Sequence, residues 1–173
     1  MTQVPGGITA SQTIGPFPHE GMRWAFEASM QDPPGAIAIT GQVLDGDGNP
    51  VNDAVIEAWT PTVANREQAR ALPAFRRVAS GEQGEFRLAL TPPEGGTRGA
   101  PLAYVCVFAR GLLCHVFTAV HLSDDPALAD APLLAQVPED RRDTLVAQRG
   151  SDGAYRWDVH LQGPRETVFL DFE

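Results

Sequence analysis

Apolar and polar positions fall into short runs along the chain, and glycine- and proline-rich turns separate these runs. Residues 85–90 alternate with a period of two, which is typical of a strand with one buried face. Further apolar runs of strand length cover residues 36–44, 54–59, 75–79, 102–109, 112–122, 155–161 and 167–172. We therefore expect about eight short strands.

Two segments depart from this pattern. Residues 138–150 start at Pro138, continue with acidic residues and end at Arg149 and Gly150, which predicts a helix. Residues 2–18 have no period and are rich in glycine and proline, so we expect an extended arm.

The predicted elements favour an all-β fold. Many short strands with few helices are typical of a two-sheet β-sandwich of the immunoglobulin or transthyretin type. We expect one such domain over residues 1–173, with one or two short helices. Residues 1–35 are its N-terminal arm. A free arm is usually disordered, and the alternative, which we expect here, is an arm that packs on a partner chain.

Composition narrows the possible partners. The formal net charge is −9, which argues against nucleic acid and anionic membrane surfaces. No apolar run approaches the length of a membrane span, and residues 1–10 lack the basic and apolar regions of a signal peptide, so we expect a cytoplasmic protein. The two cysteines, Cys106 and Cys114, both lie in strand-like runs. Two buried reduced thiols are expected, with a disulfide as the alternative.

The usual catalytic groups do not form a set in the sequence. His115 and His121 are six residues apart on one predicted strand, about 20 Å, which is too far for a shared metal. Cys114 and His115 are neighbours and would face opposite sides of that strand, which rules out a Cys–His pair. The sequence also contains no Gly-x-Ser-x-Gly motif.

The run at residues 102–109 ends at Arg110 and Gly111. It predicts a buried strand that places one cation at its end. Arg110 is either a solvated surface residue or a group that holds a carboxylate through two parallel hydrogen bonds. The pattern of residues alone favours the solvated alternative.

Six segments carry a family resemblance, in the same order along nearly the whole chain. They are residues 11–17, residues 39–48 with 56–59, and residues 107–111, 141–147, 154–158 and 166–172. Together they resemble the α-type subunits of the intradiol ring-cleaving dioxygenases that act on protocatechuate. The resemblance implies a sandwich fold shared by α- and β-type chains, which pair in a large hetero-oligomer.

The resemblance also implies that the metal lies in the other chain. In this family, a β-type chain holds Fe(III) through two tyrosines and two histidines. The His-x-His positions here are Leu102 and Tyr104, and Glu67 stands at the first tyrosine position. The implied cofactor is thus a ferric ion held by the partner β subunit, and this chain holds none.

The same resemblance implies a role for four residues. Thr13, Gly15 and Pro16 match an arm that lines the cleft over the partner's iron, and Arg110 matches an arginine that faces the substrate carboxylate. Ile14 and Phe17 differ from the residues that are commonest at these positions in the family, which are alanine and tyrosine. The implied reaction inserts O2 between the hydroxyl-bearing carbons of protocatechuate and gives 3-carboxy-cis,cis-muconate, with Arg110 as an orienting group.

Two other interpretations stay open at this point. The chain could be a non-catalytic β-sandwich, a scaffold or binding module that has kept only the fold. Alternatively, it could be a self-sufficient metalloenzyme that uses His115 or His121 together with Tyr104.

Overall fold

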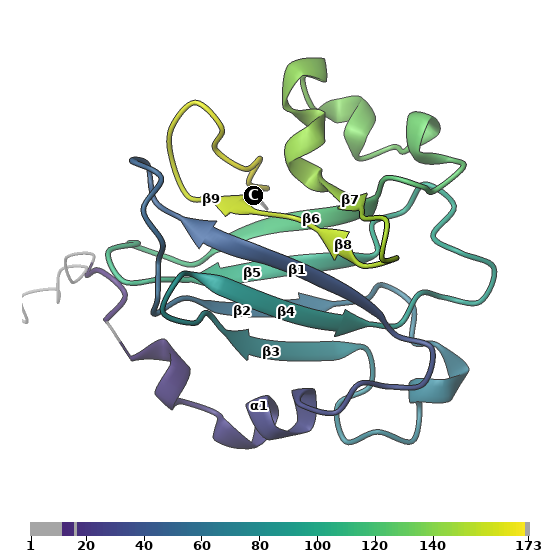
Figure 1. Cartoon of the computed structure of the whole chain (residues 1–173), viewed down its shortest axis with the longest axis horizontal. Helices are drawn as coiled ribbons and strands as arrows, with labels where there is room; N and C mark the ends of the chain where they lie inside the picture. The colour runs from purple at the N-terminus through teal and green to yellow at the C-terminus, as the bar shows by residue number, and fades with distance from the viewer. Residues whose placement is uncertain (1–11, 16, 172–173) are drawn as a thin grey trace, which may run out of the picture.

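The computed structural model describes residues 12–15 and 17–171, and strands dominate it (Figure 1). The strands are β1 (Ile37–Leu44), β2 (Val55–Trp59), β3 (Phe75–Ala79), β4 (Glu85–Leu90), β5 (Ala103–Phe108), β6 (Val116–Leu122), β7 (Val146–Arg149), β8 (Tyr155–Arg156) and β9 (Val159–His160). The helical segments are α1 (Arg23–Ser29) and the 3-10 turns η1 (Pro18–Glu20), η2 (Asn65–Glu67), η3 (Leu128–Asp130), η4 (Leu134–Gln136) and η5 (Glu139–Leu145).

The strands follow one hydrogen-bonded path. Their order is β3-β2-β5-β6-β7-β8-β1-β4, and β9 pairs with β1 beside this path. Most neighbours are antiparallel, whereas β6–β7, β1–β8 and β1–β9 are parallel. Figure 1 shows α1 beside β3, and the η3–η5 region next to β7 on the opposite side of the molecule.

One apolar core joins the two halves of this path. Ile39 of β1 and Leu88 of β4 belong to the same buried cluster as Ile56 of β2 and Val105 of β5. All four side chains are completely buried. The mostly-β architecture predicted from the sequence is confirmed. The division into two separate sheets stays a prediction, because the hydrogen bonds run continuously from β3 to β4.

Several predicted strands match closely. Residues 75–79 and 85–90 form β3 and β4 with the expected bounds; the first half of β4 alternates, with Phe86 buried between exposed Glu85 and Arg87, and Leu88, Ala89 and Leu90 are all buried. The runs at residues 36–44 and 54–59 become β1 and β2, and the run at residues 102–109 becomes β5, each shortened by one or two residues.

The predicted strands at the C-terminal end are partly wrong. Strand β6 begins only at Val116, because residues 112–115 form the turn after β5. The run at residues 155–161 divides into β8 and β9. Within the described part of residues 167–172, the pairing is one isolated bridge between Leu170 and Phe117.

The predicted helix at residues 138–150 is also wrong. Residues Glu139–Leu145 form a 3-10 turn, and β7 follows at once. Val146 and Ala147 pair in parallel with the end of β6, and both are buried. Tertiary packing therefore determines the structure of this segment, and the capping pattern does not.

The two cysteines differ. Cys106 is buried on β5, as expected, but Cys114 is exposed because the turn before β6 carries it. Burial, followed by the nearby charge of Glu57, raises the pKa of Cys106 to about 12. Both thiols are free, so the alternative of a disulfide is wrong. Among the described residues, no helix is long and apolar enough to cross a membrane.

Candidate functional site

Arg110 follows β5 and points to solvent. The strand leading to it is buried from Leu102 to Ala109, except for Tyr104 and part of Phe108. The side chain of Arg110 is 65% exposed. The sequence-based prediction of a buried strand that presents a cation at its end is therefore confirmed.

Asp53 is the charge partner of Arg110. Its carboxylate Oδ2 lies 3.3 Å from Arg110 Nε. The Asp53 side chain is 9% exposed, and neither of its oxygens accepts a hydrogen bond from the described residues. The guanidinium is thus held along its Nε edge by a nearly buried anion.

The N-terminal segment lies against the turn that follows Arg110. The backbone N–H of Ile14 donates to Leu112 O at 2.6 Å, and Gly111 N–H donates to Ile14 O at 3.4 Å. These bonds place Thr13 and Gly15, both exposed, beside the end of β5. Three of the four predicted binding residues therefore lie in one region, which we call the arm–turn site: Thr13, Ile14, Gly15, Arg110, Gly111 and Leu112. The fourth, Pro16, falls outside the described residues.

Glycine is required at only one of the two glycine positions of this site. Gly111 has φ of +91°, a conformation that other residues rarely adopt. A Cβ added at Gly15 would meet nothing within 4 Å. Close approach of a neighbour inside this chain therefore does not explain the glycine at position 15.

A second arginine fixes the N-terminal segment further along. Arg77 Nη2 donates to the carbonyl oxygen of Pro18 at 2.9 Å, and Arg77 also forms a buried ion pair with Glu57. Its guanidinium carbon lies 4.9 Å from the centroid of the Phe26 ring. The segment before β1 is thus anchored to the chain's own strands at two places.

The predicted metal positions carry no ligand set for iron. Leu102 is apolar and completely buried, and Tyr104 lies opposite Trp59 and Ala119 in the sheet. Glu67 is 1% exposed and accepts a hydrogen bond of 2.8 Å from Arg76 Nη2. Burial would raise the pKa of Glu67, but hydrogen bonds from its neighbours, Arg76 among them, outweigh burial and lower it. These residues do not fit a ferric ion.

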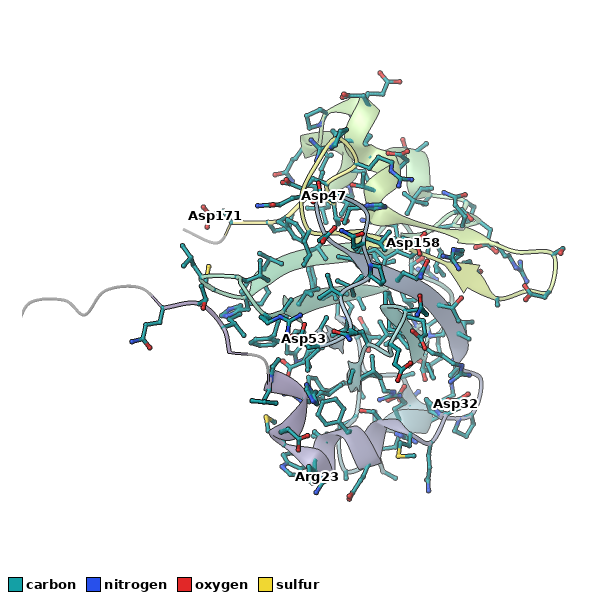
Figure 2. All side chains as sticks on the ribbon, turned by 60° about the vertical axis from the view of Figure 1, so that its left-hand side comes forward. Arg23, Asp32, Asp47, Asp53, Asp158 and Asp171 are labelled. Atoms are coloured by element: carbon teal, nitrogen blue, oxygen red, sulfur yellow. The ribbon has the colours of Figure 1, made fainter. Side chains whose placement is uncertain are left out.

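The metalloenzyme alternative needs His115 or His121 as a metal ligand, and neither lies in a suitable environment. His115 is exposed in the turn before β6 and stacks with Phe108 and Phe117. His121 is completely buried on β6, and burial lowers its pKa to about 4. No group of three or more His, Cys, Asp or Glu residues in the described part of the chain could hold a metal ion. Three of the aspartates are labelled in Figure 2, Asp32, Asp158 and Asp171, and they lie far apart from one another.

Known proteins of similar sequence share nearly the full length of this chain. A protocatechuate 3,4-dioxygenase alpha chain of Burkholderia cepacia is 36% identical over 94% of this chain and 96% of its own length. The alpha chain of Pseudomonas putida is 35% identical over 95% and 96%, respectively. The chain belongs to the protocatechuate 3,4-dioxygenase alpha-chain family. A beta chain of Burkholderia cepacia is more distant, at 25% identity over 90% of this chain and 76% of its own length. No family model matches the sequence.

Solved structures support the fold of this alpha-chain family member. The dioxygenase domain of a carbohydrate-binding fusion protein from Streptomyces sp. SirexAA-E has a TM-score of 0.56 at 14% identity and covers 93% of this chain and 96% of that domain. Catechol 1,2-dioxygenase from Pseudomonas arvilla C-1 has a TM-score of 0.53 at 18% identity, covering 78% of this chain and 54% of that one. At these identities, the likeness concerns the fold alone.

Asp53 is the site residue that the sequence analysis missed. The register of β2 and β5 ends with Val55 opposite Phe108, and Asp53 and Arg110, each two residues beyond that pair, meet as an ion pair in the adjoining turns. The two strands were both predicted, but their pairing was not. With β2 and β5 aligned as neighbours, the sequence would have placed Asp53 near Arg110.

Proposed function

We propose that this chain is the non-iron-binding α subunit of a protocatechuate 3,4-dioxygenase. The observation that carries the proposal is identity of 35–36% with two alpha chains over nearly the whole length of each. The residues at the expected iron positions support it, because Leu102 is buried and apolar while Glu67 is neutralised by Arg76. The single core shared by both halves of the strand path supports the two-sheet sandwich of this proposal.

The partner in this proposal is a β subunit that holds Fe(III). A beta chain matches the sequence at lower identity, which supports a pair of related chains. In the pair, the iron would supply the ring-opening chemistry with O2, and the product from protocatechuate would be 3-carboxy-cis,cis-muconate. The larger αβ hetero-oligomer and the cytoplasmic location remain expectations from the sequence.

The contribution of this chain would be to orient the substrate. Protocatechuate carries a ring carboxylate, and the exposed guanidinium of Arg110 is suited to bind it by charge-assisted hydrogen bonds. Thr13, Gly15 and Pro16 would line the cleft facing the partner's iron. Orientation of this kind accelerates a reaction by positioning, and no bond is made by this chain.

Co-expression with a related chain that carries two tyrosines and a His-x-His pair tests the subunit assignment. Iron content, co-elution and O2 uptake on protocatechuate would be measured for each chain and for the pair. We expect iron and turnover in the pair, and neither in this chain alone. Stoichiometric iron and O2 uptake in this chain alone would refute the assignment. Co-elution without any turnover would favour a scaffold.

Replacement of Arg110 tests the role of the arm–turn site. In the assembled pair, Arg110→Ala should weaken protocatechuate binding about tenfold, because a charge-assisted hydrogen bond to an exposed group contributes at the lower end of about 1.5–3 kcal/mol. The control is Arg98→Ala, an exposed arginine whose Nε donates to Gly95 O in another loop. Unchanged affinity in Arg110→Ala would contradict the proposed role.

A further inference from the structure

We propose that Asp53 is a positioning residue that fixes the orientation of Arg110 toward a carboxylated aromatic substrate. The inference rests on the proposed function and adds to it a residue that acts through Arg110 without touching substrate itself. The position of Asp53 is labelled in Figure 2.

The sheet register brings the two residues together. Strands β2 and β5 are antiparallel, with Val55 opposite Phe108 and Glu57 opposite Cys106. Asp53 and Arg110 each lie two residues beyond the Val55–Phe108 pair, in the turns next to the strand ends. Their charged groups meet there, with Asp53 Oδ2 3.3 Å from Arg110 Nε. The paired strands therefore bring the two turns together, and opposite charges on neighbouring strands attract each other.

Burial makes Asp53 the fixed member of the pair. Its side chain is 9% exposed, against 65% for Arg110. Neither carboxylate oxygen accepts a hydrogen bond from the described residues. A carboxylate removed from water needs a cation or hydrogen-bond donors, and Arg110 supplies the cation. The long arginine side chain is thus drawn toward one anchored point.

The contact leaves the functional edge of the guanidinium free. Asp53 Oδ2 lies 3.3 Å from Nε, and the Arg110 side chain is 65% exposed, which leaves its Nη groups accessible. Those two groups can bind a carboxylate through parallel hydrogen bonds. Holding Nε therefore reduces the freedom that Arg110 must lose when the substrate binds.

The negative charge of Asp53 has an opposing effect, because it weakens the attraction of Arg110 for an anionic substrate. The two effects predict opposite results when Asp53 is shortened. If orientation dominates, Asp53→Ala weakens carboxylate binding. If charge competition dominates, Asp53→Ala strengthens it. Asp53→Asn keeps the size of the side chain but removes its charge, and so tests whether the ionic attraction or the bulk of Asp53 holds Arg110.

The test compares protocatechuate with catechol, the same ring without the carboxylate, as ligands of the assembled αβ enzyme. Asp53→Ala should raise the KM for protocatechuate about two- to tenfold, the range expected for ordering one long side chain, and leave the KM or inhibition constant of catechol unchanged. Asp53→Asn should raise it as well, because Asp53 holds Arg110 by its charge and accepts no hydrogen bond from it. In an Arg110→Ala background, Asp53→Ala should have no further effect, because it acts only through Arg110.

Each alternative result has a definite meaning. Tighter or unchanged protocatechuate binding in Asp53→Ala overturns the positioning role, as does an equal loss for catechol or a loss that persists in the Arg110→Ala background. If Arg110→Ala itself leaves the preference for protocatechuate over catechol unchanged, the proposed function of Arg110 fails, and this inference fails with it. Asp53→Ser, also too short to reach Nε, serves as a second variant, and co-elution with the β subunit checks assembly.

Discussion

Glu67 occupies the position at which the resemblance expects an iron-binding tyrosine in β-type chains, and here it is part of the core. It lies at the end of η2, completely enclosed, and its two oxygens accept hydrogen bonds from Arg76 Nη2 and from the backbone N–H of Ala74. Arg76 is as deeply buried as Glu67 and also donates to Ala89 O. The charge at this position therefore serves the fold, and a metal could not displace Arg76 without leaving a second buried charge.

Replacing Glu67 by glutamine should be strongly destabilising. Glu67→Gln keeps the shape but leaves the buried guanidinium of Arg76 without a counter-charge, a loss that typically costs about 3–5 kcal/mol. Denaturant unfolding at pH 7 measures this effect. Glu82→Gln, which alters an exposed residue of the turn before β4, is the matched control and should change stability by less than about 0.5 kcal/mol. Equal stability of the two variants would contradict the structural role of Glu67.

At the scale of elements, the strands could be predicted because burial leaves a period of two. The period is visible in the first half of β4, where Phe86 is buried between exposed Glu85 and Arg87. It fails at residues 112–115, three of which are apolar although the segment forms a turn. There Gly111 reverses the chain, and Leu113 is 66% exposed. An exposed leucine in a turn cannot be distinguished from a strand leucine by pattern alone.

The helical elements were harder to predict than the strands. Helix α1 begins after Met22, which has φ of +56° and gives no side-chain cap, and its first turn contains no acidic residue. The usual sequence markers of a helix start are therefore missing. Conversely, residues 139–145 carry those markers but form a 3-10 turn, because Val146 is required as the partner of His121 in the sheet.

The candidate site could be predicted only in part, because some of its contacts depend on tertiary structure. The end of a strand is visible in the sequence, so Arg110 was found. The attachment of the N-terminal segment depends on backbone hydrogen bonds between Ile14 and residues 111 and 112, which leave no trace in side-chain pattern. Asp53 depends on which strands pair, and pairing is a property of the whole sheet.

The turn after β5 should be sensitive to substitution at Gly111. Gly111→Ala forces a residue with a Cβ into a left-handed conformation and should cost about 1 kcal/mol or more in stability. It should also disturb the hydrogen bonds to Ile14. Gly15→Ala is the matched control, since a Cβ there meets nothing, and it should leave the stability of this chain unchanged. Thermal unfolding measures the stability of both variants. A larger loss of stability for Gly15→Ala than for Gly111→Ala would contradict the requirement for glycine at position 111.

At the scale of the whole molecule, the segment before β1 reaches both ends of the strand path. At β3, the backbone N–H of Arg77 donates to Ser29 Oγ of α1 at 2.9 Å. Near β4, both Nη groups of Arg87 donate to the carboxylate of Asp32, which precedes β1. The segment before β1 thus contacts both end strands of the path. The same segment carries Thr13 and Gly15 to Arg110, so its packing connects stability with the proposed site.

The stability of the whole chain should depend on pH through His121. This side chain is completely buried, neither ring nitrogen forms a hydrogen bond with the described residues, and burial lowers its pKa from 6.5 to about 4, against a smaller opposing effect of Asp125. Between these two values, the unfolded chain binds a proton that the folded chain does not. Stability should therefore fall as the pH drops from about 6.5 to about 4, by about 3 kcal/mol at most, and this contribution should level off below pH 4.

Unfolding free energies measured across this range for wild type and His121→Leu test the expectation. Leucine removes the titrating group and two unpaired polar atoms, so His121→Leu should keep its stability near pH 7 and lose less of it on acidification. Val146→Ala, which truncates the buried neighbour of His121 across the sheet, should lower stability by a similar amount at every pH. Parallel pH curves for wild type and His121→Leu would show that His121 does not limit acid stability. A flatter curve for His121→Leu would show that the buried His121 of β6 contributes to the loss of stability in acid.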